Sequence, residues 1–223
     1  MKEYLAPVLT IDAVIFQLVN NQLCVLLIER LNEPFKGSWA LPGGYNPRGE
    51  TTTQALKRIV KTKAGVDTSK LGLVEQLYTF DSVARDPRGH AVSVSYLGLG
   101  ESITPMAGKQ TENPTFFPVN ELPELAYDHQ KIIAYARERL GSKISYTNAV
   151  NALLPGLFSL GQLQAAYEAV EGHALDKRNF RKRFFELNII EATTEYTRQG
   201  AHRPARLYKF KKQELEHLPR YLG

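Results

Sequence analysis

Cysteine is almost missing from this sequence: one residue of 223, Cys24, is a cysteine, so the chain cannot form an internal disulfide. Cys24 lies in an apolar run typical of a strand, where a buried, unreactive thiol is more common than a reactive one. No apolar run approaches the roughly 18 to 20 residues that cross a bilayer, and residues 1–7 lack the apolar segment of a secretory signal. We therefore expect a soluble, cytoplasmic protein with no membrane partner.

Strong compositional bias is also missing. The chain has 12 Pro and 16 Gly without a repeat, and 43% of its residues are hydrophobic, which excludes collagen-like and disordered chains. A globular chain of this length has room for one large or two small cores.

The first part of the chain has no excess charge. Residues 1–140 contain 15 basic and 15 acidic residues, whereas residues 141–223 contain 13 and 8, so the whole net charge of +5 belongs to the last 83 residues. Such asymmetry indicates that one part meets a polyanion and the other does not. A solvated basic surface is the alternative.

Apolar patterning predicts a mixed first region of α+β class. Residues 8–19 and 23–29 are rich in Val, Ile, Leu and Phe around Asn20-Asn21-Gln22, which predicts a β-hairpin. Residues 51–63 place apolar side chains at helical spacing, and Gly65 is the expected stop. Further strands are predicted at residues 71–80 and 91–99, and a second helix at residues 128–140.

A domain boundary is predicted at Gly141-Ser142-Lys143, where the second helix should end and the charge and pattern change. It divides the chain into domains 1–140 and 141–223. In the second domain the pattern predicts helices at about residues 146–154, 159–170 and 176–187, followed by strands at residues 189–192 and 205–210.

Gly44, Glu50 and Arg58 stand at the spacing Gly-x5-Glu-x7-Arg, with Leu41-Pro42-Gly43 in front and Gly65-Val66 behind. This frame resembles the Nudix box, whose full form carries three more glutamates. The resemblance implies a Nudix-fold α/β/α sandwich, in which the box glutamates hold a divalent metal that activates diphosphate hydrolysis.

The three further glutamates are missing here, and their positions hold Ile59, Thr62 and Lys63. Hard cations such as Mg²⁺ need carboxylate oxygens, and Lys63 would repel them. Glu50 is the one carboxylate left in the motif. We therefore expect the fold without the chemistry: no metal, no catalytic residue and no enzymatic activity.

A second motif is the loop Arg85-Asp86-Pro87-Arg88 between two predicted strands. Its arginines flank a Pro-stiffened turn and can present guanidinium forks to a diphosphate, and Asp86 can accept from a ribose hydroxyl. Similar loops occur in Nudix proteins that handle ADP-ribose-like or nicotinamide-nucleotide ligands; a salt-bridged exposed loop is the alternative. Trp39 could stack on an adenine, although aromatics near strand ends more often belong to the core. The predicted effector-binding residues are Trp39, Gly43, Gly44, Arg85, Asp86 and Arg88.

Basic residues concentrate on one predicted helix of the second domain. Phe180, Phe184 and Leu187 form an apolar stripe, and Asp176 is a suitable N-cap. The order of helices followed by a hairpin is typical of a winged helix-turn-helix, whose second helix enters the major groove. The predicted DNA-binding residues are Lys177, Arg178, Asn179, Arg181 and Lys182 on the helix, and Arg198, His202, Arg203 and Arg206 on the hairpin.

The combination resembles the Nudix-related transcriptional regulators, repressors that join a Nudix-like sensor to a C-terminal winged helix. Leu153-Leu154-Pro155, Arg178-Asn179-Phe180-Arg181 and Arg203-Pro204-Ala205-Arg206 look like the tail of that family. The resemblance implies a homodimeric repressor of genes of NAD cofactor metabolism or sugar catabolism, with double-stranded operator DNA as partner, ADP-ribose or a related nucleotide as effector, and no cofactor.

A different class of function stays open. A Nudix hydrolase acting on ADP-ribose-like nucleoside diphosphates could recover metal binding through Glu50 together with Glu75 or Glu112.

Overall fold

Two asparagines make the first turn of the fold. The computed structural model describes residues 6–107, 111–197 and 204–218, and it opens with strands β1 (Val8–Val19) and β2 (Gln22–Arg30). Asn20 and Asn21 join these strands with φ angles of 51° and 62°, a left-handed backbone that asparagine tolerates and that tight hairpins require. The predicted hairpin is confirmed.

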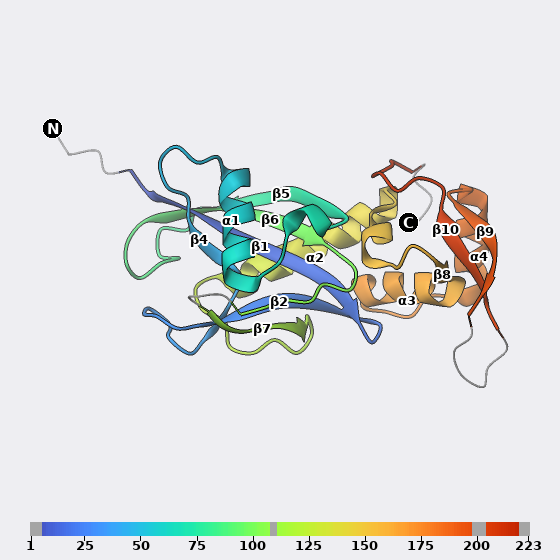
Figure 1. Ribbon diagram of the computed structural model, residues 1–223, viewed down its shortest axis with the longest axis horizontal. Helices are drawn as coiled ribbons and strands as arrows, with labels where there is room; N and C mark the ends of the chain where they lie inside the picture. The colour runs from blue at the N-terminus through green and yellow to red at the C-terminus, as the bar shows by residue number, and fades with distance from the viewer. Residues whose placement is uncertain (1–5, 108–110, 198–203, 219–223) are drawn as a thin grey trace.

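A seven-stranded mixed sheet forms around this hairpin (Figure 1). β1 pairs in parallel with β6 (Ala91–Leu99), and β6 pairs antiparallel with β5 (Leu73–Phe80), so both further predicted strands are confirmed. The sequence pattern does not predict three other strands, of which two are too short to show alternation. They are β3 (Trp39–Ala40) and β7 (Thr111–Pro118), which pair with β2, and β4 (Gly43–Tyr45), which pairs with β1.

One helix covers each face of the sheet. Helix α1 (Thr52–Ala64) begins at a capping box between Thr51 and Gln54 and ends at Gly65, whose φ is 69°. A short 3-10 helix, η1 (Thr68–Lys70), follows. The buried side chains of α1 cluster with Ile11, Ala13 and Ile15 of β1, whereas those of helix α2 (His129–Tyr146) cluster with Val14 and Phe16. Alternate residues of β1 thus face opposite helices, and the predicted α/β/α sandwich is confirmed.

Helix α2 continues past the position where the sequence pattern ends it. The predicted stop at Gly141 is wrong, because the helix runs on to Tyr146 and buries Lys143 and Ile144. A glycine inside a helix costs roughly 1 kcal/mol, and burial of the last turn offsets that cost. The end of this helix does not mark a domain boundary, so the division into 1–140 and 141–223 stays a prediction.

The chain after α2 forms a smaller unit. The helix predicted at 146–154 is a 3-10 helix, η2 (Ala149–Leu153), whereas the other predicted elements are confirmed. Ser159 caps α3 (Leu160–Glu171) and Asp176 caps α4 (Lys177–Leu187). Strands β8 (Phe158–Ser159), β9 (Ile190–Tyr196) and β10 (Arg206–Phe210) form a three-stranded sheet in the order β8-β10-β9.

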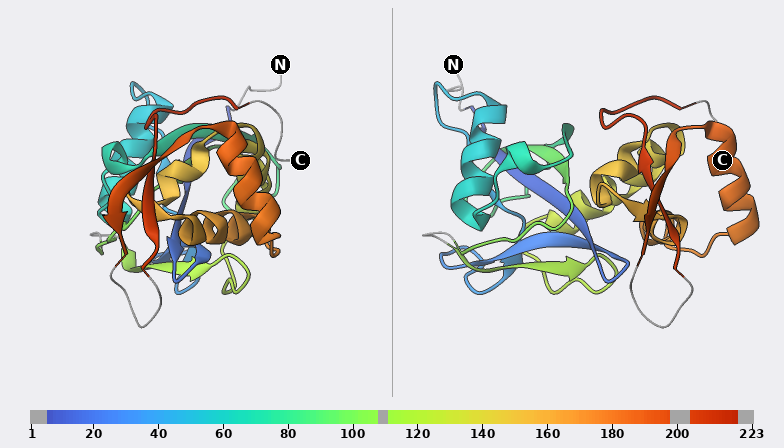
Figure 2. Two further views of the ribbon diagram at one scale, coloured as in Figure 1. Left: turned by 90° about the vertical axis from the view of Figure 1, so that its right-hand side faces the viewer. Right: turned by 45° about the vertical axis from the view of Figure 1, so that its right-hand side comes forward.

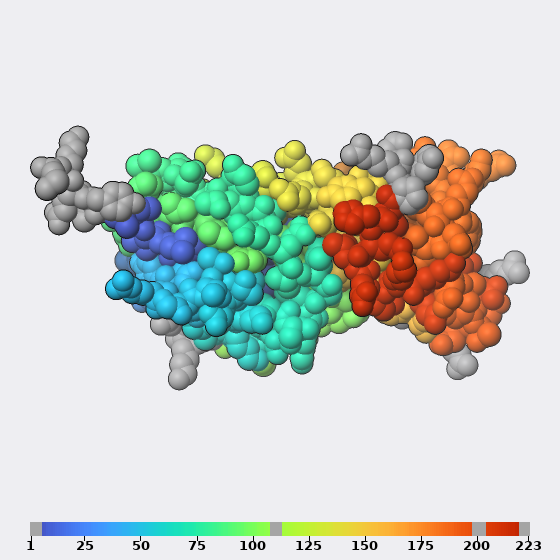
Figure 3. All heavy atoms as spheres, turned by 90° about the horizontal axis from the view of Figure 1, so that it is seen from above, coloured from blue at the N-terminus to red at the C-terminus, as the bar shows by residue number. Residues whose placement is uncertain are grey.

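The two units lie end to end along the long axis (Figures 1 and 3), and α2 runs from the sheet of the first unit toward the second. One buried cluster runs from Val14 of β1 through Leu140 and Ile144 of α2 to Phe184 of α4. Helix α4 lies on the side of the second unit that faces away from the first (Figure 2). Within the described residues, no helix is long and apolar enough to cross a membrane.

Candidate functional sites

A cavity of about 440 Å³ opens beside β1, between the box and the start of α2. Its wall brings together five basic residues and three acidic ones, which favours an anionic ligand. Among the predicted effector-binding residues, Gly43, Gly44, Arg85, Asp86 and Arg88 line this cavity. Its other polar residues are Thr10, Asp12, Arg30, Asn32, Glu33, Tyr45, Arg58, Thr62, Lys63, Tyr127 and His129.

Trp39 lies apart from this cavity. Its ring packs edge-on against Phe117, with ring centroids 4.6 Å apart, in the hydrophobic cluster beneath α2. The next residue of β3, Ala40, belongs to the cluster beneath α1. Because successive strand residues face opposite sides of the sheet, the side chain of Trp39 points into the core. This is the alternative to adenine stacking that the sequence analysis gives for Trp39.

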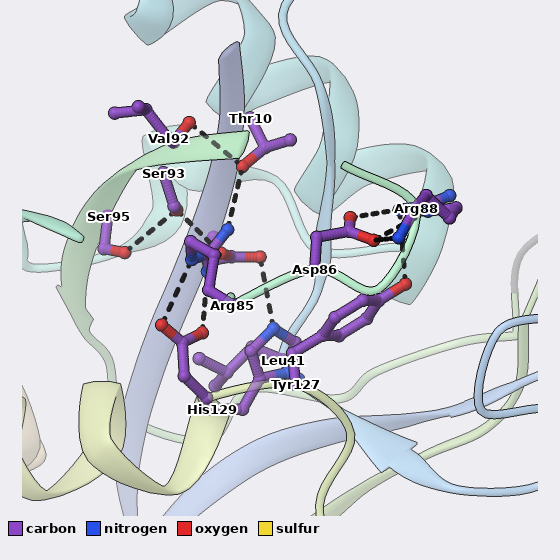
Figure 4. A network of polar contacts seen from close by, with 12 residues as sticks. Thr10, Leu41, Arg85, Asp86, Arg88, Val92, Ser93, Ser95, Tyr127 and His129 are labelled. Carbon is purple, nitrogen blue, oxygen red and sulfur yellow. Dashed lines mark hydrogen bonds and ion pairs between the residues drawn. The ribbon is translucent and has the colours of Figure 1, made fainter. Parts of the chain in front are cut away.

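Arg85 is buried in a network of carboxylates (Figure 4). Its Nη2 donates to Oδ2 of Asp12 at 3.1 Å and to Oδ1 of Asp128 at 2.8 Å, and its Nε donates to Oδ2 of Asp128 at 3.1 Å. In this structure carboxylates occupy the guanidinium of Arg85, and its role in effector binding stays a prediction. A guanidinium that is only 4% exposed needs carboxylate partners, and these two occupy it.

Asp12 is the centre of the same network. Burial alone would raise the pKa of this carboxyl group, but His129, Arg85 and the hydroxyl of Ser93 lower it to about 2. Nδ1 of His129 lies 2.9 Å from the backbone N–H of Leu41, and Nε2 of the same ring lies 3.5 Å from Oδ1 of Asp12. The network therefore ties the first residue of α2 to β1.

Arg88 is the more accessible arginine of the loop. Its Nε and Nη2 donate to the two carboxylate oxygens of Asp86 at 3.0 and 2.7 Å, and its side chain is 44% exposed. The guanidinium lies 5.6 Å from the ring centre of Tyr45 and 5.9 Å from that of Tyr127. Hydrogen bonds from Arg88 lower the pKa of Asp86. Asp86, the predicted acceptor for a ribose hydroxyl, therefore already accepts hydrogen bonds from Arg88.

The one carboxylate of the box, Glu50, is paired with an arginine in this structure. Oε1 and Oε2 of Glu50 accept from Nε and Nη2 of Arg58 at 2.9 and 2.6 Å, and this pairing lowers the pKa of Glu50. Ile59 is buried on the inner face of α1, and the hydroxyl of Thr62 donates to the carbonyl of Arg58 at 2.8 Å. In the described part of the chain, no group of three or more His, Cys, Asp or Glu side chains could hold a metal ion.

Glu75, the carboxylate proposed to rescue metal binding, lies on the other face of the sheet. Its Oε2 lies 2.8 Å from Nζ of Lys143 on α2. It therefore cannot join Glu50, which precedes α1 on the opposite face. The side chain of Glu112 lies outside the described residues.

The candidate DNA-binding surface lies on α4. Lys177, Arg178, Asn179 and Lys182 are exposed, while Phe180 and Phe184 are buried against Tyr167 of α3. Arg181 is half-buried, and within the described residues its Nε is buried without a hydrogen-bond partner. The predicted division into an apolar and a basic face therefore holds, with Arg181 at its edge.

The predicted wing is described only in part. Arg206, at the start of β10, is exposed and donates its Nε to the carbonyl of Thr193 at 2.8 Å. Arg198, His202 and Arg203 lie outside the described residues.

Residues 8–136 match the family model of the NUDIX domain, and residues 150–210 match that of the NrtR DNA-binding winged helix domain. A protein of Acinetobacter baylyi named an ADPR responsive transcriptional repressor is 35% identical over 229 aligned residues, which cover 99% of this chain and 89% of that protein. This chain belongs to the NrtR family of Nudix-related transcriptional regulators. The predicted family is confirmed.

Solved structures of NrtR from Shewanella oneidensis resemble this chain in both units. The complex of that NrtR with a 27mer DNA matches with a TM-score of 0.74 and 33% identity, over 91% of this chain and 93% of that one. Its NUDIX domain in complex with ADP ribose matches with a TM-score of 0.56 and 36% identity, over 61% of this chain and 90% of that one.

An enzyme is also similar to part of this chain. A protein of Methanocaldococcus jannaschii named an ADP-ribose pyrophosphatase is 39% identical over 132 residues, which cover 58% of this chain and 73% of that protein. This similarity covers little more than half of the chain.

Sequence reasoning misses several residues that line or support the cavity. Asp12 and Asp128 are 73 and 43 residues away from Arg85 in the sequence, and no local sequence pattern predicts that they pair with it. Tyr127 has a φ of 56°, a left-handed backbone conformation that the residues around it in the sequence do not predict. Arg30 is the last residue of the apolar strand β2, and its position at a strand end is the one signal that could have singled it out.

Proposed function

We propose that this chain is a transcriptional repressor that binds operator DNA through α4 and the β9–β10 hairpin and responds to ADP-ribose or a related nucleotide in the cavity. Membership of the NrtR family supports this proposal, and so do a relative named for its response to ADPR and a similar structure that contains DNA. The regulated genes are proposed to be those of NAD cofactor metabolism, as the family resemblance implies.

The cavity suits a nucleotide that contains a diphosphate. Arg30, Arg58, Lys63, Arg85 and Arg88 outnumber the acidic residues of its wall, which favours phosphate oxygens. The exposed ring of Tyr45 and the ring of Tyr127 have their centres 5.6 and 5.9 Å from the guanidinium of Arg88, and a base or ribose can pack against them.

The exposed basic face of α4 suits the major groove. Lys177, Arg178 and Lys182 can pair with phosphates or guanine edges, and Asn179 can pair with adenine. We propose that two copies of the chain form a homodimer that places two such helices on a two-fold operator. The cytoplasm is the proposed location of this complex.

The observation that carries the regulatory proposal is the continuous helix α2. It begins at His129, which lines the cavity and is bound to Leu41, and it ends at Tyr146, which accepts a hydrogen bond from Leu218 of the C-terminal segment at 2.7 Å. The next residue but one, Asn148, holds the same segment through Glu214 and Glu216. A change at the cavity wall is thereby transmitted to the second unit without an intervening loop.

A ligand changes DNA affinity only if it binds the DNA-competent and DNA-incompetent forms with different affinity. We propose that the nucleotide favours a form in which the two α4 helices of the dimer no longer fit adjacent half-sites. Binding of the effector then releases the repressor from the operator DNA.

The test is a gel-shift titration with the full-length protein. Binding selection from random duplex DNA first yields an operator, and ADP-ribose is then added with AMP as the control nucleotide. We expect operator affinity to fall as ADP-ribose saturates the protein, and Arg88→Ala to weaken this response without changing affinity in the absence of nucleotide. Lys57→Ala, an exposed change on α1 outside the cavity, is the matched control. Unchanged operator affinity at saturating ADP-ribose would exclude this effector.

A hydrolase is the second candidate, favoured by the 39% identity with the Methanocaldococcus enzyme. Against it we weigh the pairing of Glu50 with Arg58 and the absence of carboxylates at positions 59, 62 and 63. The hydrolase predicts Mg²⁺-dependent conversion of ADP-ribose to AMP and ribose phosphate, lost in Glu50→Gln. We expect no turnover in either protein.

A further inference from the structure

Tyr127 has a backbone conformation that is rare for a bulky residue. Its φ is 56°, in the left-handed region where the Cβ of an L-residue crowds the backbone. Phe35, whose φ is 65°, lies against it, and the two ring centroids are 4.8 Å apart in an edge-on contact. A strained backbone of this kind persists only where surrounding contacts hold it, and such strain is concentrated at binding sites and switch regions. The contacts of the Tyr127 ring therefore decide whether this conformation is kept.

Two arginines of the cavity wall hold the ring of Tyr127. The guanidinium carbon of Arg30 lies 5.0 Å from the ring centre, and that of Arg88 lies 5.9 Å from it. Nη2 of Arg88 also donates to the hydroxyl of Tyr127 at 3.3 Å (Figure 4). All three residues line the cavity. A ligand that binds these arginines therefore competes with the ring for them.

Tyr127 also joins the sheet to α2. On one side, the backbone N–H of Ala126 donates to the carbonyl of Trp39 at 2.8 Å, which fixes the chain to β3. On the other side, Asp128 is the N-cap residue of α2, and His129 is its first residue. The ring centroid of His129 lies 5.3 Å from that of Tyr127. A change in φ at Tyr127 alone would therefore turn the start of α2 relative to the sheet.

We propose that Tyr127 is the positioning residue that couples the effector to α2. Phosphate groups of the nucleotide draw Arg30 and Arg88 away from the ring, and residue 127 then leaves its left-handed conformation. The inference rests on the proposed function and names the residue through which that regulation acts.

Two physical differences favour the released form once the nucleotide is bound. Hydrogen bonds from a guanidinium to phosphate oxygens are stronger than its contact with an aromatic ring. Relief of the backbone strain at Tyr127 acts in the same direction. The two forms thus differ in their affinity for the nucleotide, which a shift of population requires.

Tyr127→Gly tests this inference in the full-length protein, because glycine adopts the left-handed backbone without strain and has no ring. Tyr127→Asn is the second variant, in case the glycine variant does not fold, since asparagine also tolerates this conformation. The readout is the ratio of the operator Kd at saturating ADP-ribose to the operator Kd without nucleotide. This ratio measures the coupling and not the affinity for ADP-ribose, and we expect it to be about tenfold or more in the unaltered protein and within about twofold of one in both variants.

Two further variants serve as controls. Tyr127→Phe removes only the hydroxyl group and keeps the ring and the strained backbone, so it should retain most of the ratio. Ser102→Gly places glycine at another left-handed residue, whose φ is 53° and which is exposed outside the cavity wall, so its ratio should be unchanged. Isothermal titration calorimetry with ADP-ribose verifies saturation, and thermal unfolding verifies that each variant is folded.

The outcomes separate this inference from the function on which it rests. If the folded glycine or asparagine variant keeps the full ratio at saturation, Tyr127 is at most a ligand contact, and the inference is overturned while the effector assignment stands. If the unaltered protein binds no ADP-ribose, or binds it with a ratio of one, the effector assignment fails and the inference fails with it.

Discussion

Nη2 of Arg85 lies 3.1 Å from Oδ2 of Asp12, an ion pair in which the two side chains are 4% and 7% exposed. We expect Arg85→Gln to lower the free energy of unfolding by about 3–5 kcal/mol, because it leaves buried carboxylates without a cation. Urea denaturation measures this change. Arg58→Gln, which removes an ion pair at the surface of the same unit, is the control and should cost clearly less. Equal losses for the two variants would contradict the structural role of the buried pair.

Acid should weaken the fold through Asp12. Its pKa is about 2 in the folded chain against 3.8 for the ordinary carboxyl group, so its contribution to stability is fully present above about pH 4 and is lost as the pH falls toward 2. The measurement compares the free energy of unfolding of the unaltered protein and Asp12→Asn from pH 2 to pH 6. The difference between the two should be constant above about pH 4 and shrink below it. A difference independent of pH throughout would refute this prediction.

Two glycines should respond to alanine in opposite directions. Gly141→Ala should stabilise the protein by about 0.5–1 kcal/mol, because this glycine lies inside α2 and an added Cβ would meet no atom within 4 Å. Gly65→Ala should destabilise it, because φ is +69° and the added Cβ would lie 2.8 Å from Cβ of Met106. Thermal and urea unfolding report both changes. A lower stability of the Gly141→Ala variant would show that α2 needs the backbone freedom of glycine at this position.

Alanine substitutions on α4 should separate phosphate contacts from base contacts. Loss of a phosphate contact at Arg178 or Lys182 should weaken binding to all sequences and reduce the slope of log affinity against log salt by about 0.9. Loss of a base contact at Asn179 should relax specificity at one position and cost about 1–3 kcal/mol. Fluorescence anisotropy at several salt concentrations measures both effects, with Lys57→Ala as the control. Unaltered binding by the Arg178 and Lys182 variants would remove α4 from the interface.

The sequence predicts those elements whose signals are local. The helix at α1 follows from apolar spacing between Thr51 and Gly65, and α4 follows from Asp176 and the stripe of Phe180 and Phe184. Both depend on residues within three or four positions of one another, the range over which helical contacts repeat.

The rest depends on contacts that sequence spacing does not encode. The partners of Arg85 are distant in the chain, so the pattern suggests an open arginine where the fold supplies two carboxylates. The extension of α2 past Gly141 is decided by burial of Ile144 among residues of the second unit. Both differences arise where tertiary packing overrides a local preference.

The length of α2 has a mechanical consequence. Its 18 residues form a rod of roughly 27 Å at 1.5 Å per residue. A tilt of about 5° at His129 would sweep the far end through about 2 Å. A helix of this length would thus convert a small rearrangement beside the cavity into a displacement comparable with the length of a hydrogen bond at the second unit, enough to misalign the proposed pair of DNA-binding helices.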